Sequence, residues 1–236
     1  MTEIDGGFAG GIDGGIAGGI AGNVRRILER IQSAAERSGR PPHSVRLVAV
    51  TKTVRAERIR AAVACGIADI GENRLQEALL KRDALAPESL TWHFIGHLQT
   101  NKAKKVVENF NWVHSIDRLD LAEALSRHAS NRPPLPVLIE VKLQEEPNKA
   151  GVSERELPQL IESVRALQNI ELRGLMVIPP PVDDPEEARP FFRRLRRLAA
   201  DSGLHELSMG MTHDFEVAVE EGATMVRIGT GLFGSR

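Results

Sequence analysis

Leu47-Val48-Ala49-Val50-Thr51 is an apolar run rich in β-branched residues, and it ends at Lys52. Such a run predicts a strand buried in a parallel sheet. Alternate residues of a strand share a face, so Val48, Val50 and Lys52 should point the same way. An amine at the mouth of an apolar interior is costly to keep charged, and its neutral form is a nucleophile. Alternatively, Lys52 extends past the strand end into water, and its position does not separate these two interpretations.

Seven further apolar runs follow, and amphipathic helical patterns separate them. The eight predicted strands are 46–51, 68–71, 91–95, 112–115, 137–141, 172–177, 206–208 and 225–228. The clearest helical patterns are 101–109, 118–128, 154–167 and 185–200. Strands that alternate with helices in this number predict an α/β fold of the (β/α)8 TIM-barrel type. An open doubly wound sheet is the competing fold, but its glycine-rich first turn is missing at Lys52-Thr53-Val54-Arg55.

The first 22 residues differ from the rest of the chain. Gly10-Gly11-Ile12, Gly14-Gly15-Ile16 and Gly18-Gly19-Ile20 repeat every four residues. Glycine at this density opposes a stable helix, so residues 1–22 are predicted to be a flexible tail. The barrel domain is predicted to span residues 23–236 and to begin with an extra helix, 24–37, capped by Asn23.

Composition excludes several classes of protein. The 236 residues carry a net charge of −1, which gives no reason to expect a nucleic-acid or membrane-surface partner. The arginine-dense segment 191–198 is explained by a buried stripe of Phe191, Leu195 and Leu198 with solvated arginines outside it. One cysteine excludes an internal disulfide, and no apolar stretch reaches the length of a membrane span. We therefore expect a cytoplasmic protein.

The last two predicted strands are followed by loops suited to an anion. The loops are Ser208-Met209-Gly210-Met211-Thr212 and Gly229-Thr230-Gly231, and Asp214 should open a helix after the first. Glycines free backbone N–H groups for close approach, and the threonines add hydroxyl donors. Phosphates often bind after strands 7 and 8 of such barrels, so the two loops together indicate a phosphate cradle.

Three other polar residues should face the barrel interior or its mouth. Arg227 lies inside the last strand and needs a partner, which is either a structural carboxylate or a ligand. His93 of the third strand is either a hydrogen-bonded core residue or a functional one, and Asn73 follows the second strand.

A mouth lysine, a phosphate cradle and a buried arginine together describe a site for pyridoxal 5′-phosphate (PLP). In it Lys52 forms the Schiff base and Arg227 faces the pyridine nitrogen.

Seven segments in this order resemble the pyridoxal-phosphate homeostasis protein family, single-domain relatives of the alanine racemase N-terminal barrel. They are LVAVTKT (47–53), GENRLQE (71–77), WHFIGHLQTNK (92–102), HSIDR (114–118), GLMVIP (174–179), SMGMTHD (208–214) and MVRIGTGLFG (225–234). The resemblance implies that Lys52 is the cofactor lysine. The remaining cofactor-binding residues that we predict are Asn73, His93, Met176, Ser208, Gly210, Thr212, Arg227, Gly229 and Thr230.

Two positions depart from the family pattern. Thr212 stands where the segment often has serine, which keeps the hydroxyl but adds a methyl group. Arg74 stands where some relatives carry a tyrosine beside the ring, so aromatic stacking is not expected there.

The resemblance implies a protein that holds PLP as a Lys52 aldimine, limits its free concentration and delivers it to PLP-dependent apo-enzymes. Efficient racemisation is not expected, because the chain contains no tyrosine to act as second base and has no room for a second domain after Arg236. An arginine at the pyridine nitrogen also weakens the electron sink. The alternatives are a weak amino-acid racemase or related lysine-aldimine enzyme that uses His93 or water, and an aldolase whose Lys52 attacks a phosphorylated sugar. We expect a monomer.

Overall fold

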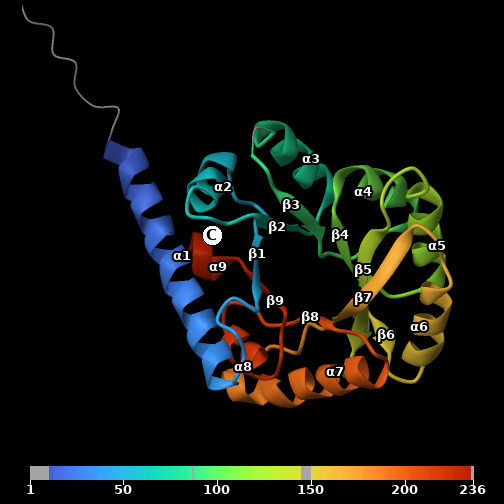
Figure 1. Cartoon of the computed structure of the whole chain (residues 1–236). Coiled ribbons are helices and arrows are strands. Elements are labelled where there is room, and N and C mark those ends of the chain that lie inside the picture. The colour runs from blue at the N-terminus through green and yellow to red at the C-terminus, as the bar shows by residue number, and fades with distance from the viewer. Residues whose placement is uncertain (1–10, 87, 145–149, 235–236) are drawn as a thin grey trace, which may run out of the picture.

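The computed structural model describes residues 11–86, 88–144 and 150–234, and their parallel strands form a ring with helices outside it (Figure 1). Because β1 pairs with both β2 and β9 and β4 pairs with β5, the sheet closes into a barrel. The predicted TIM barrel is confirmed. Its strands are β1 (Arg46–Val50), β2 (Asp69–Glu72), β3 (Thr91–Phe94), β4 (Trp112–Ile116), β5 (Leu135–Lys142), β7 (Ile170–Met176), β8 (Glu206–Ser208) and β9 (Met225–Ile228).

Helices cover the outside of the barrel and alternate with its strands. They are α2 (Ala56–Val63), α3 (Leu75–Ala84), α4 (Ala103–Asn109), α5 (Leu119–His128), α6 (Leu157–Arg165), α7 (Arg189–Asp201), α8 (Phe215–Glu220) and α9 (Thr230–Phe233), with 3-10 turns η1 (Thr100–Lys102) and η2 (Pro185–Ala188). Each predicted strand overlaps an observed one. The two-residue strand β6 (Val152–Ser153), which pairs with the end of β5, was not predicted because so short a segment has no periodicity.

The N-terminal helix begins earlier than the sequence predicted. Helix α1 spans Gly11–Arg37, so a start at Asn23 is wrong, and only residues 1–10 of the predicted flexible tail lie outside the described residues. Ile20 and Val24 are both about 2% exposed, which extends the buried stripe of α1 into the glycine-rich segment. Asn23 is not a cap: its side chain donates to Leu232 O at 2.9 Å and attaches α1 to α9. Tertiary burial therefore outweighs the low helix propensity of glycine here.

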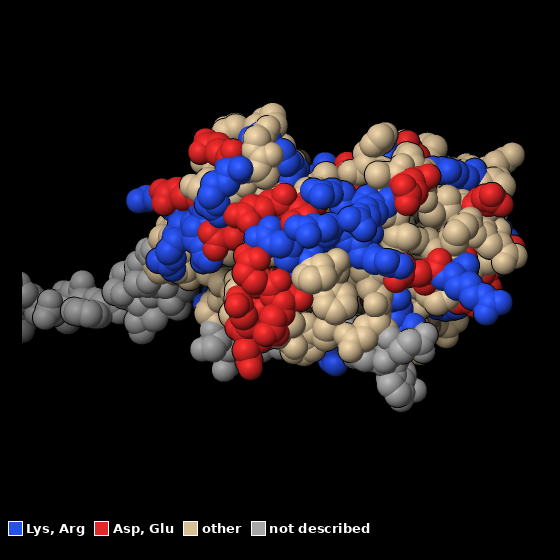
Figure 2. Space-filling model, turned by 90° about the horizontal axis from the view of Figure 1, so that it is seen from below, with Lys and Arg blue, Asp and Glu red and all other residues tan. Residues whose placement is uncertain are grey.

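Helix α7 carries its arginines on the molecular surface, where Figure 2 shows a belt of basic side chains bordered by acidic ones. The predicted solvated face is confirmed, but the buried stripe is Phe192, Leu195 and Ala199, so the stripe of Phe191, Leu195 and Leu198 was wrong at two positions. Four of these arginines form ion pairs: Arg189, Arg193 and Arg196 contact Glu221, and Arg194 contacts Glu154. In the described parts of the chain, no helix has the length and apolar content that crossing a membrane requires.

Candidate functional site

A cavity of about 440 Å³ opens at the carboxyl ends of the strands. This is the end at which barrel enzymes build their sites, and the volume suits a small ligand. Six of the predicted site residues line it together: Lys52, Asn73, Thr212, Arg227, Gly229 and Thr230. The remaining lining residues, which the sequence analysis did not assign, are Val50, Ile95, Ile178, Met211 and His213. Val50, Ile95, Ile178 and Met211 make much of the wall apolar.

Lys52 follows β1 directly and lines the cavity with Val50, as the predicted shared face requires. It also borders a second cavity of about 490 Å³ that shares Val50, Gly229 and Thr230 with the first. Within the described residues, the Lys52 amine makes no hydrogen bond or ion pair. The amine is therefore available to react with or bind a ligand from the cavity.

The backbone on either side of Lys52 is fixed by a buried polar cluster. Lys81 Nζ lies 2.6 Å from both Glu72 Oε1 and Glu77 Oε1, and it also donates to Thr51 O. The backbone N–H of Thr53, which has a positive φ of 63°, donates to Glu77 Oε1. A threonine in this conformation is strained, so the contact with Glu77 helps to hold the turn that presents Lys52.

The two predicted phosphate loops meet at one point of the cavity. Thr230 Oγ1 lies 3.1 Å from Thr212 Oγ1, and the backbone N–H of Gly231 donates to Thr212 Oγ1 at 3.2 Å. The first loop is folded back on itself by Asp214, whose Oδ1 accepts from Met211 N at 2.6 Å. Burial raises the pKa of Asp214, while the Met211 hydrogen bond and the charge of Arg227 oppose that rise. The hydroxyl pair is thus a preformed polar end of the cavity.

Arg227 enters the cavity from β9 and is only 4% exposed. Its Nη1 donates to Ser208 Oγ at 2.7 Å and its Nη2 donates to Val177 O at 2.9 Å. Burial lowers the pKa of Arg227 to about 10, although the charges of Glu140 and Asp214 act in the opposite direction. The guanidinium remains a cation near neutral pH, and it is held in place by neutral oxygen acceptors.

Asn73 supplies an unused polar atom at the cavity. Its Oδ1 is buried and has no hydrogen-bond partner among the described residues. Buried polar atoms without a partner are uncommon in folded proteins, and at a cavity they indicate a ligand contact. Arg74 next to it is exposed and does not line the cavity.

Four predicted site residues do not line the cavity. Ser208, His93 and Met176 are fully buried inside the barrel. Gly210, with φ of 91°, packs so closely on α8 that an added Cβ would lie 2.5 Å from Ala218 Cβ. Direct cofactor contact by these four residues stays a prediction. His93 faces the interior as expected, but its ring nitrogens are 2.8 Å from Asp69 Oδ1 and 2.9 Å from His114 Nε2.

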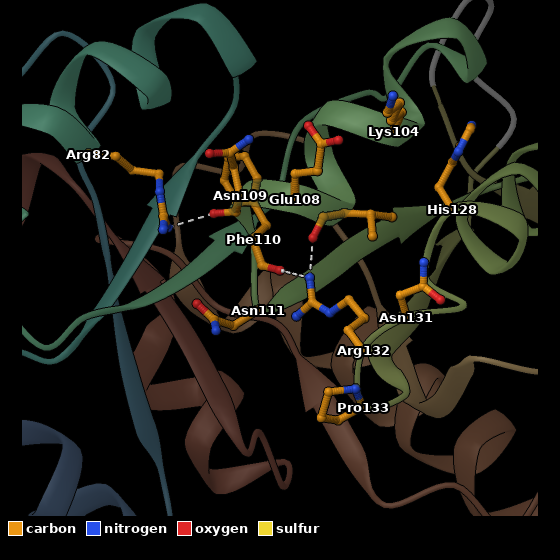
Figure 3. Close-up of a pocket in the computed structure, with 11 residues that line it drawn as sticks. Arg82, Lys104, Glu108, Asn109, Phe110, Asn111, His128, Asn131, Arg132 and Pro133 are labelled. Carbon is orange, nitrogen blue, oxygen red and sulfur yellow. Dashed lines mark hydrogen bonds between the residues drawn. The ribbon is translucent and has the colours of Figure 1, made fainter.

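A larger cavity, of about 610 Å³, lies near the amino ends of the strands, where Asn111 precedes β4 and Pro133 precedes β5 (Figure 3). Its arginines are occupied by main-chain oxygens. Arg82 donates to Asn109 O at 2.6 Å, and Arg132 donates to Phe110 O at 3.1 Å and to Val107 O. These contacts satisfy carbonyls at the end of α4, so we assign this cavity a structural role.

The fold and the site define a (β/α)8 barrel protein with an amine, a hydroxyl pair and a buried guanidinium around one cavity. The family model "Alanine racemase, N-terminal domain" matches residues 23–236. A pyridoxal phosphate homeostasis protein of Pseudomonas aeruginosa is 48% identical over 214 residues, which cover 89% of this chain and 93% of that one. The chain therefore belongs to the pyridoxal phosphate homeostasis proteins of the alanine racemase N-terminal domain family.

One solved structure supports this assignment, and a second shares the barrel fold. PipY of Synechococcus elongatus, solved with PLP bound, has 44% sequence identity and a TM-score of 0.75, and the match covers 88% of this chain and all of that one. Alanine racemase from Corynebacterium glutamicum has a TM-score of 0.68 at 20% identity, and 60% of that chain is covered. The second likeness shows the barrel fold alone.

Proposed function

We propose that this protein binds pyridoxal 5′-phosphate covalently through Lys52 and takes part in PLP homeostasis. The observation that carries the proposal is that Lys52, Arg227 and the Thr212–Thr230 hydroxyl pair line one cavity. A PLP-bound relative at 44% identity and the pyridoxal phosphate homeostasis protein of Pseudomonas aeruginosa agree with it.

The residues at the cavity fit the parts of this cofactor. When bound, PLP supplies an aldehyde that condenses with a lysine amine and releases water. Among the described residues the Lys52 amine has no hydrogen-bond or ion-pair partner, and the Thr212 and Thr230 hydroxyls suit the phosphate. The buried cation of Arg227 suits the pyridine nitrogen, and Asn73 Oδ1 offers an unused acceptor. Val50, Ile95 and Ile178 supply apolar surface for the ring.

We propose a carrier role rather than catalysis. The sequence contains no tyrosine, and His93, the candidate second base, is fully buried, does not line the cavity and has both ring nitrogens engaged. Reversible binding at Lys52 would let the protein hold the reactive aldehyde and pass it to PLP-dependent apo-enzymes. A monomeric state and a cytoplasmic location complete this proposal as predictions from the sequence.

The covalent site is tested by titrating purified protein with PLP and recording the visible spectrum. Wild type should develop a visible absorbance band, and borohydride should fix the cofactor on the peptide that contains Lys52. Lys52→Ala should show neither signal. Lys104→Ala, which removes a lysine that lines the larger cavity of Figure 3, is the matched control and should behave as wild type. A band that survives in Lys52→Ala would overturn the assignment.

The carrier role requires a separate experiment. Loaded wild-type protein should restore activity to an apo-form of a PLP enzyme, and incubation with amino acids should yield no racemised or decarboxylated product. If wild type converts an amino acid and Lys52→Ala does not, the protein is an enzyme and the carrier proposal is wrong.

A further inference from the structure

A continuous chain of hydrogen bonds runs through the barrel interior from Asp69 to Arg227. Asp69 Oδ1 lies 2.8 Å from His93 Nε2, and His93 Nδ1 lies 2.9 Å from His114 Nε2. His114 Nδ1 lies 2.9 Å from Ser208 Oγ, which accepts from Arg227 Nη1 at 2.7 Å. The five groups come from β2, β3, β4, β8 and β9, so the barrel topology brings them together.

When both imidazoles are neutral, the two ends of this series of hydrogen bonds fix the direction of every bond between them. A carboxylate only accepts hydrogen bonds and a guanidinium only donates them. His93 Nε2–H therefore donates to Asp69, which leaves Nδ1 as the acceptor for His114 Nε2–H. His114 Nδ1 then accepts from the Ser208 hydroxyl. In the neutral state both imidazoles are therefore Nε2–H tautomers, and the Ser208 hydroxyl proton points to His114 Nδ1.

Burial supports the neutral state of both imidazoles. His93 and His114 are fully buried, and burial lowers the pKa of each below its ordinary value. For His114 the charges of Arg227 and Arg46 act in the same direction, whereas for His93 Asp69 opposes the shift. Both ring nitrogens of His93 and of His114 already contact a neighbour in this series of hydrogen bonds, so neither histidine has a nitrogen free to bind a metal.

We propose that Asp69, His93, His114 and Ser208 are positioning residues that fix the orientation of the Arg227 guanidinium at the cavity. This rests on the proposed function, because Arg227 is the cation that would meet the pyridine nitrogen. It also assigns the Ser208 side chain to Arg227 rather than to the phosphate. Removing the hydroxyl should leave Nη1 without its acceptor and release the guanidinium from its set orientation.

The first test needs no ligand. Nitrogen NMR of protein labelled at histidine should give an unprotonated Nδ1 and a protonated Nε2 for both His93 and His114. Asp69→Asn replaces the carboxylate with an amide that both donates and accepts, so the signals of His93 should split between two tautomers. An Nδ1–H tautomer or a charged imidazole in wild type at neutral pH would contradict the proposed direction of the hydrogen bonds from Arg227 to Asp69. A single unchanged tautomer in Asp69→Asn would overturn the role of Asp69 in setting its direction.

The second test measures PLP binding and the induced circular dichroism of bound PLP, which reports the ring environment. Ser208→Ala should raise the Kd for PLP about tenfold and change the visible dichroism band. Ser126→Ala is the matched control, because it also removes a buried serine hydrogen bond, to Gln168 O, on α5. The control should keep the wild-type Kd and band.

A conservative variant separates positioning from loss of packing. His114→Leu should weaken binding as Ser208→Ala does, whereas His114→Gln should restore it, since Gln can donate to His93 and accept from Ser208. If Ser208→Ala and His114→Leu match Ser126→Ala in both readouts, the positioning role is wrong. If wild type binds no PLP, the proposed function fails and the role toward PLP fails with it. The NMR result would still decide whether the series of hydrogen bonds from Arg227 to Asp69 exists.

Discussion

Lys81 Nζ lies 2.6 Å from Glu72 Oε1, and this buried ion pair stands beside the strand end that carries Lys52. Thr51 joins the pair from the strand side, since its hydroxyl donates to Glu72 Oε1 at 2.5 Å and its carbonyl accepts from Lys81. Glu72 is fully buried, and burial raises its pKa although the hydrogen bonds from Lys81 and Thr51 oppose the rise. Because Thr51 directly precedes Lys52, the ion pair that stabilises the fold also holds the backbone beside Lys52.

We expect Lys81→Met to destabilise the protein by about 3 to 5 kcal/mol, because it leaves the Glu72 carboxylate buried without its cation. Urea unfolding at pH 7 measures the loss. Lys105→Met changes an exposed lysine of α4 and should cost less than about 0.5 kcal/mol. Adding Glu72→Gln to Lys81→Met removes the unpaired charge and should recover part of the stability. Equal stabilities for Lys81→Met and Lys105→Met would contradict this account.

Gly210 sets the path of the loop between β8 and α8, and we expect Gly210→Ala to be strongly destabilising. Its φ is 91°, and an added Cβ would lie 2.5 Å from Ala218 Cβ and 3.0 Å from Phe215 Cα. Two effects combine at Gly210: strain of the left-handed backbone and overpacking by the added Cβ. Gly203 has the first effect alone, because its φ is 62° and an added Cβ would meet nothing within 4 Å. Gly203→Ala should cost about 1 to 2 kcal/mol from backbone strain. Gly210→Ala should cost about 1 to 3 kcal/mol more from overpacking, as measured by urea unfolding.

The sequence predicted the strands and several site residues, but not the start of the N-terminal helix. Apolar runs separated by helical patterns predicted all eight barrel strands, because a buried parallel strand requires an apolar run whatever its neighbours are. The same logic placed Lys52 after the first strand, Arg227 inside the last strand, and Thr212 and Thr230 in the loops that follow the last two strands. The start of α1 was missed because glycine content reports local propensity, whereas Ile20 is buried by contacts distant in sequence.

The hydrogen-bond chain was missed for a related reason. His114 stands in an ordinary strand, and nothing local indicates that its ring lies between His93 and Ser208. Sequence patterns report which face of a strand is buried, but the partners of a buried polar group depend on the register between strands. Ser208 was assigned to the phosphate because it begins the glycine-containing loop, and its side-chain contacts are known only once β8 and β9 are placed.

Glu221 follows α8 directly and joins it to α7 through ion pairs, and we predict that it is the most sensitive of the acidic residues that pair with the α7 arginines. Its side chain is 6% exposed and contacts Arg189, Arg193 and Arg196. Burial alone would raise the pKa of Glu221, but the hydrogen bonds from Arg193 and Arg189 outweigh it and lower the pKa. We expect Glu221→Gln to cost about 1.5 to 3 kcal/mol at pH 7.

The control for this prediction is Glu186→Gln. Glu186 also pairs with Arg189, but its side chain is 57% exposed, so its removal should have little effect. Because a carboxylate with a lowered pKa stabilises the fold only while it is ionised, the difference between wild type and Glu221→Gln should shrink as the pH falls below about 4.5. A difference that is constant from pH 7 to pH 4 would show that packing, not charge, explains the effect.

The buried histidines predict a loss of stability in mild acid. The pKa values of His93 and His114 are lowered by burial from the model-compound value of 6.5, so below pH 6.5 the unfolded chain binds more protons than the folded one. Their stabilising contribution is therefore complete above about pH 6.5 and is lost as the pH falls below it. Between pH 7.0 and pH 5.5, His114, whose pKa is lowered well below its ordinary value, should account for a loss of up to about 1 kcal/mol in the free energy of unfolding, and His93 should add a loss in the same direction.

Urea unfolding of wild type and His114→Gln at these two pH values tests this. Glutamine preserves the donor to His93 and the acceptor for Ser208 but does not titrate, so the variant should lose up to about 1 kcal/mol less than wild type on acidification. His97→Gln, which removes a histidine that is 57% exposed, is the control and should lose as much as wild type. Equal losses in wild type and His114→Gln would mean that His114 binds its proton equally well in the folded and unfolded states. The one-way hydrogen-bond chain from Arg227 to Asp69 would then lose its neutral central member.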